Sequence, residues 1–63
     1  MKKFPIAAMG SRKDGRKWAL IERETEDSDL IDAAFVTLKA ATKLKVGDSL
    51  ELTDSKIERL KWS

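Results

Sequence analysis

A chain of 63 residues can form only one small domain, and this chain lacks both cysteine and histidine. A disulfide framework and a zinc site are therefore excluded as sources of stability. The formal net charge of +2 is too small to indicate a partner. Its distribution is uneven, because residues 1–18 hold six basic and one acidic side chain while residues 19–32 hold one basic and six acidic side chains. Asymmetry of this kind often shapes association.

The N-terminal segment MKKFPIAAMGS begins like a signal peptide, but its apolar run from Phe4 to Met9 is only six residues long and contains Pro5. Arg12 and Lys13 follow where a cleavage site would be needed. We therefore expect this segment to be part of the folded domain. No apolar run approaches the roughly 18 residues of a membrane helix. We expect a soluble, cytoplasmic protein with no membrane partner.

The first predicted element is a β-hairpin formed by residues 3–12 and 16–24, because Asp14-Gly15 is a strong hairpin signal. A two-residue turn gives these opposed pairs: Lys13–Arg16, Arg12–Lys17, Ser11–Trp18, Met9–Leu20 and Ala8–Ile21. One face then carries Phe4, Ile6, Ala8, Ala19 and Ile21, and the other carries Ala7, Met9, Trp18 and Leu20. Pro5 lacks an amide donor, which predicts that the first strand lies at a sheet edge near its start.

The next predicted element is a helix over about residues 28–44. Its apolar positions follow a helical period and are Leu30, Ile31, Ala34, Phe35, Leu38 and Ala41. Asp27 or Ser28 can cap its start, and Gly47 can supply the left-handed residue that ends it.

The C-terminal segment VGDSLELTDSKIERLKWS predicts a second hairpin with the loop Asp54-Ser55-Lys56. This places Leu50 opposite Leu60 and Glu51 opposite Arg59. Because lysine, glutamate, arginine and leucine also form helices well, a short helix over residues 55–62 remains the alternative. The predicted fold class is α+β for the single domain 1–63, a β-β-α-β-β chain with one helix across one face of a small antiparallel sheet.

An enzyme is not expected. Without histidine, cysteine or tyrosine, the commonest general base and most activated nucleophiles are missing. The acidic run from Glu22 to Asp29 lacks the alternating, glycine-centred pattern of a calcium loop, and no phosphate-binding glycine motif is present. We therefore predict no metal, no cofactor and no small-molecule substrate.

The strongest functional signal is the cluster of cations at the predicted hairpin tip. Lysines and arginines there suit a phosphate backbone, and an adjacent tryptophan can stack on a base or wedge into a groove. The candidate nucleic-acid-binding residues are Arg12, Lys13, Arg16, Lys17 and Trp18. Two ordinary interpretations compete with this one. Solvated lysines prevent aggregation at strand edges, and a basic tip can also contact an acidic protein surface.

The second signal is an apolar patch on the sheet face that a single helix leaves uncovered. Its candidate interface residues are Met9, Trp18 and Leu20, and such clusters often mark protein interfaces. The alternative function is thus a protein-binding adaptor or inhibitor of the size that phages and mobile elements encode, or a homodimer. Sheet twist and the stems of basic side chains can instead cover the patch. The sequence leaves open DNA, RNA or protein as the partner, and the oligomeric state.

Overall fold

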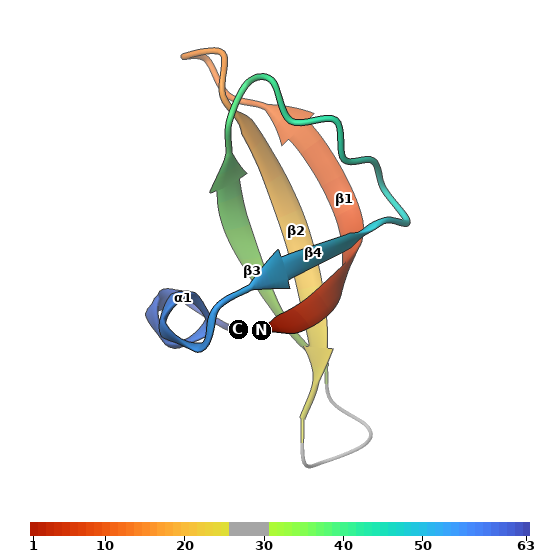
Figure 1. Cartoon of the computed structure of the whole chain (residues 1–63), viewed down its shortest axis with the longest axis vertical. Helices are drawn as coiled ribbons and strands as arrows, with labels where there is room; N and C mark the ends of the chain where they lie inside the picture. Colours follow the sequence, from red (N-terminus) through yellow and green to blue (C-terminus); the bar gives the residue numbers. More distant parts are fainter. Residues whose placement is uncertain (26–30) are drawn as a thin grey trace.

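The computed structural model describes residues 1–25 and 31–63 and consists of an antiparallel sheet followed by one short helix (Figure 1). In chain order the elements are β1 (Lys2–Ser11), β2 (Lys17–Glu24), β3 (Ile31–Leu38), β4 (Ser49–Leu52) and α1 (Asp54–Arg59). The sheet order is β3-β2-β1-β4. A small α+β fold is confirmed, but the order of its elements differs from the predicted β-β-α-β-β. No helix in the described part of the chain is long and apolar enough to cross a membrane.

The predicted first hairpin is confirmed, but its register is shifted by one residue. The loop has three residues instead of two, because the Arg12 amide donates to the Arg16 carbonyl at 2.7 Å. The Gly15 amide donates to the Arg12 carbonyl at 3.1 Å, and Gly15 has a φ of 91°. A left-handed glycine at the last loop position is typical of three-residue hairpin loops. As a result Gly10, not Ser11, lies opposite Trp18.

This shift changes which side chains share a face, because neighbouring residues on a strand point to opposite sides. Met9 lies opposite Ala19 and packs against the core, so its predicted place in the exposed patch was wrong. Ala8 lies opposite Leu20 instead of on the core side. An irregularity between Ile6 and Ala8 keeps Ile6 opposite Ile21, and both are buried.

The predicted helix is replaced over residues 31–38 by β3, which pairs with the whole length of β2. Buried Ala34 and Val36 alternate with exposed Phe35, which is the period of a strand. Ala34 and Val36 lie opposite Ile21 and Ala19, so the β2 ladder and the core both favour the extended form. The expected start of the helix, with its cap at Asp27 or Ser28, lies outside the described residues.

The last part of the chain corrects the predicted second hairpin. Leu50 and Leu52 are buried on β4, but they lie opposite Phe4 and Lys2 of β1. Because β1 already supplies the partner, residues 54–59 form α1, which is the alternative that the sequence left open. The Thr53 side chain caps the helix by accepting from the Lys56 amide at 3.3 Å.

Strand β1 lies between β2 and β4 in the sheet, but over Lys2–Pro5 it pairs with β4 alone. Its side toward β2 is open there, which agrees with the edge position predicted near its start. Pro5 is tolerated because it lies where the two ladders meet. Pairing with β4 ends at Pro5, and pairing with β2 begins at Ile6. The missing amide therefore falls at a gap between ladders.

One face of the sheet carries the core, whose buried members are Phe4, Ile6, Ala19, Ile21, Ala34, Val36, Leu50 and Leu52. Leu44, Ile57, Leu60 and Trp62 from the later part of the chain pack against it. Trp62 contacts the Phe4 ring at a centroid distance of 5.5 Å, and its indole N–H donates to the Ile57 carbonyl at 3.0 Å. The C-terminal chain thus covers this core face. Trp18, Leu20 and Phe35 lie on the opposite one, the outer face.

Candidate nucleic-acid interface

Two aromatic rings from neighbouring strands meet on the outer face. Trp18 of β2 and Phe35 of β3 have ring centroids 5.5 Å apart, and their planes cross at 77°. Trp18 is half-buried, whereas Phe35 leaves 67% of its surface exposed. Aromatic pairs prefer this edge-to-face arrangement. We call this pair of rings, Trp18 and Phe35, the aromatic corner. Its Phe35 side is open to solvent.

Gly10 of β1 makes room for the Trp18 side of this corner. A Cβ atom at Gly10 would lie 2.5 Å from the indole carbons Cε2 and Cζ2, well inside van der Waals contact. Only glycine lets the indole approach the β1 backbone this closely. The pairing of Gly10 with Trp18 thus fixes where the tryptophan lies.

Arg12 and Lys13 lie beside the aromatic corner. The Arg12 guanidinium donates to the Thr37 hydroxyl of β3 at 3.2 Å, which holds this cation over the same face as the two rings. Lys13 is exposed at the turn. Together with Ser11, Asp14, Trp18 and Phe35 they line an open recess of about 560 Å³. Two cations therefore border an exposed aromatic surface.

The positive charge of Arg16 is paired with the carboxylate of Asp14 within the turn. Its Nε donates to Asp14 Oδ2 at 2.8 Å, its guanidinium forms an ion pair with the same oxygen at 2.6 Å, and its amide donates to Asp14 Oδ1 at 3.0 Å. The hydrogen bonds from Arg16 lower the pKa of Asp14, and Asp14 in turn raises the pKa of Arg16. Asp14 is ionised at neutral pH, so the ion pair is present there, and the lowered pKa of Asp14 preserves the ion pair to lower pH. It is lost only as the pH falls below the ordinary aspartate value of 3.8.

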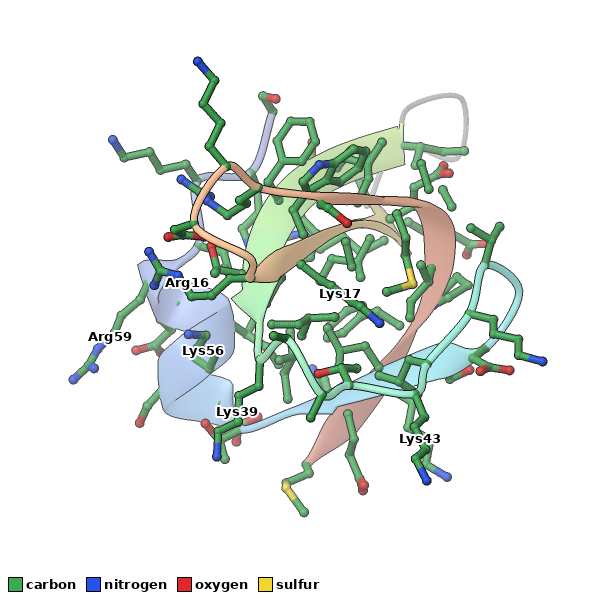
Figure 2. The ribbon with its side chains drawn as sticks, turned by 90° about the horizontal axis from the view of Figure 1, so that it is seen from above. Arg16, Lys17, Lys39, Lys43, Lys56 and Arg59 are labelled. Carbon is green, nitrogen blue, oxygen red and sulfur yellow. The ribbon has the colours of Figure 1, made fainter. Side chains whose placement is uncertain are left out.

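Lys17 belongs to the core side of the sheet. Its ammonium donates to the Thr42 carbonyl at 2.9 Å and so ties the connection between β3 and β4 to β2. Figure 2 views the molecule from the end where the first hairpin turns, and it shows Arg16 and Lys17 together with Lys39 and Lys43 of that connection. Of the five predicted nucleic-acid-binding residues, the structure brings together Arg12, Lys13 and Trp18. Arg16 is paired, and Lys17 lies on the other side.

The charge asymmetry in the sequence becomes a charge asymmetry along the sheet. The turn with Arg12 and Lys13 lies at one end, near the connection that follows β3 (Figure 1). Strand β2 runs from there to Glu22 and Glu24 at the opposite end. The longest dimension of the molecule is 36 Å, so the two charged ends are well separated. The aromatic corner lies at the cationic end.

Three residues of this face were not predicted as site residues, namely Gly10, Phe35 and Thr37. Phe35 had been assigned to the buried side of a helix, and the strand places it on the exposed face instead. The signal that could have found it is the run Phe35-Val36-Thr37, in which three consecutive residues have a high β propensity.

Leu20 is half-buried on the outer face opposite Phe35 and continues the apolar surface away from Trp18. Exposed Ile31, at the start of β3, extends it further. Two of the three predicted interface residues, Trp18 and Leu20, thus share this face.

In the part of the chain that the structure describes, no three acidic side chains gather in a way that could hold a metal ion.

Comparison with known protein families, with curated proteins and with solved structures found no match. We therefore infer function from the side chains of the outer face and their chemistry.

Asp14 offers a test of how the turn presents charge. In Asp14→Asn the amide oxygen can still accept from the Arg16 amide, but the negative charge is gone and Arg16 is free to contact a phosphate. We expect tighter binding to an oligonucleotide and a salt dependence steeper by about one unit of slope. Glu58→Gln, an equal change of charge on exposed α1, is the control. Equal gains from both variants would show that only net charge matters.

Proposed function

We propose that this protein is a non-catalytic binding module that holds DNA or RNA on its outer face. The observation that carries the proposal is an exposed aromatic corner, Trp18 and Phe35, bordered by Arg12 and Lys13. Stacking rings beside cations are the combination that nucleic-acid-binding surfaces use. The interface is thus the sheet face next to the turn, with the tip of the turn at its margin.

Phosphates supply most of the affinity in such a complex, and the aromatic rings add contacts to bases. The hydrogen-bond partner of Arg12 is the neutral Thr37 hydroxyl, so the guanidinium can still contact a phosphate, although the nearby Asp14 carboxylate attracts it. Lys13 is exposed beside it. The opposite end of β2, with Glu22 and Glu24, repels phosphates and limits the contact to the cationic half of the face.

A double substitution tests the role of the cations. Arg12→Ser with Lys13→Ser is expected to weaken oligonucleotide binding and to reduce the salt slope by about two units, one for each lost phosphate contact. The control is Lys56→Ser with Arg59→Ser, which removes the same charge from α1 (Figure 2). Binding is measured by fluorescence anisotropy over a range of salt concentrations. Equal losses in the two double variants would contradict a specific site.

The second candidate is a protein-binding role for the same face, with a second copy of this chain as the occupant. Exposed Ile31 and Phe35 favour it, because they extend the apolar surface along β3. Two outer faces stacked with their strands antiparallel would set Arg12 and Lys13 of one copy against Glu22 and Glu24 of the other. Sedimentation equilibrium separates the candidates. A dimer that dissociates in Phe35→Asp and ignores oligonucleotides would favour the second.

A further inference from the structure

We infer that the nucleic acid held on the outer face is single-stranded, with an unpaired base stacked on Phe35 in the corner that this ring makes with Trp18. The inference rests on the proposed function and adds the class of ligand to it.

Phe35 is unusually exposed for a residue of the sheet. It leaves 67% of its surface open to solvent, although its neighbours on the strand, Ala34 and Val36, are buried. The ring is held in place by its edge-to-face contact with Trp18, and Trp18 in turn rests against Gly10. A planar group can therefore stack on a ring that is already fixed, and little ordering of side chains is needed on binding.

The recess beside the two rings has a polar margin. Ser11, Arg12, Lys13 and Asp14 line the same space as the two rings. Their hydroxyl, guanidinium, ammonium and carboxylate groups provide both donors and acceptors, which match the polar edge of a base. The two cations can also reach the phosphates on either side of a stacked base. The recess thus suits a nucleotide presented by a flexible strand.

A duplex does not fit the aromatic corner. In a double helix the faces of the bases are stacked on each other, and only their edges and the phosphates are accessible. An exposed ring gains stacking energy only from a base whose face is free. A rigid duplex along the 36 Å length of the molecule would span about ten base pairs. It would then lie against Glu22 and Glu24, whereas a short single strand can stay at the cationic end.

Three probes test the inference by fluorescence anisotropy at low salt. They are a labelled oligothymidylate of about twelve nucleotides, a strand of equal length that lacks bases, and a duplex of the same length. The oligothymidylate is expected to bind roughly 5- to 150-fold more tightly than the abasic strand, the range that stacking of one base gives. The duplex is expected to bind more weakly than the oligothymidylate.

Two variants assign the effect to Phe35. Phe35→Leu keeps an apolar side chain but removes the ring, and is expected to lose the preference for the oligothymidylate while binding the abasic strand as before. Phe35→Trp is expected to keep the preference. Because Phe35 is largely exposed, both variants should fold, which thermal unfolding checks.

The outcomes separate the inference from the proposed function. If the abasic strand or the duplex binds as tightly as the oligothymidylate and Phe35→Leu changes nothing, the inference fails. The proposed function would still stand, provided that the Arg12 and Lys13 substitutions weaken binding. If none of the three probes binds, the proposed function itself fails.

Discussion

Replacing Ile21 with alanine is expected to unfold a large fraction of the protein at room temperature. Among the residues that the structure describes, Ile21 is the largest side chain that is fully buried, and it lies on β2 between Ile6 and Ala34. Truncation of a buried isoleucine costs about 2–5 kcal/mol. A domain of this size without disulfides has a free energy of unfolding of only about 3–5 kcal/mol. The substitution therefore removes most of the margin that keeps the chain folded.

The measurement is urea unfolding followed by circular dichroism. Ile31→Ala makes the same chemical change at a position that is 59% exposed and is expected to alter the free energy of unfolding by no more than about 0.5 kcal/mol. Similar midpoints for the two variants would show that Ile21 is not the centre of the core. The arrangement of β1, β2 and β3 described above would then be wrong.

Replacing Gly10 with alanine is expected to damage the binding site more than the fold. The added methyl group would overlap the Trp18 indole, and the ring must move because the β1 backbone is held at Gly10 by its pairing with β2. Moving the indole breaks its contact with Phe35. We expect the affinity for an oligothymidylate to fall roughly tenfold, within the range of a lost stacking contact.

A double-mutant cycle separates this effect from a general loss of stability. In a Trp18→Ala background there is no indole to displace, so adding Gly10→Ala is expected to change the affinity little. If Gly10→Ala weakens binding equally with and without the tryptophan, then Gly10 acts through the fold and does not position the ring. Thermal unfolding of each variant supplies the independent check.

The sequence predicted the strands of the first hairpin and the strand at Leu50 and Leu52, because both combine alternating apolar residues with clear turn signals. It missed the register of the hairpin, since Asp14-Gly15 is compatible with a loop of two or three residues. The choice depends on the conformation of Gly15 at the end of the loop. One residue of shift was enough to move Met9 to the core side and to place Gly10 under Trp18.

The helix prediction failed because Ala34, Phe35 and Leu38 satisfy a helical period as well as part of a strand period. The choice between helix and strand depends on contacts with residues far away in the sequence. Strand β2 needs a partner on its free side, and β3 supplies Ala34 and Val36 to cover Ile21 and Ala19. Tertiary pairing of this kind overrides weak local preference.

The same long-range pairing explains how much of the candidate site could be predicted. Arg12, Lys13 and Trp18 all belong to the first hairpin, and their charge and aromatic character identified them. Phe35 and Thr37 join them only through the pairing of β2 with β3, which the sequence did not reveal. Lys17 was assigned to the site because a two-residue turn would set it opposite Arg12 in the cationic tip, but its ammonium donates to the Thr42 carbonyl on the other side of the sheet.

The most direct test of the proposed interface is a titration of ¹⁵N-labelled protein with an oligothymidylate, followed by nuclear magnetic resonance. The protein has two tryptophans, and each indole N–H gives its own signal. We predict that the Trp18 indole signal and the amides of Gly10, Arg12 and Phe35 shift during the titration. The Trp62 indole, which donates to Ile57, and the amides of α1 should stay in place. Shifts at Trp62 and α1 with none at Trp18 or Phe35 would place binding elsewhere and contradict the proposed interface.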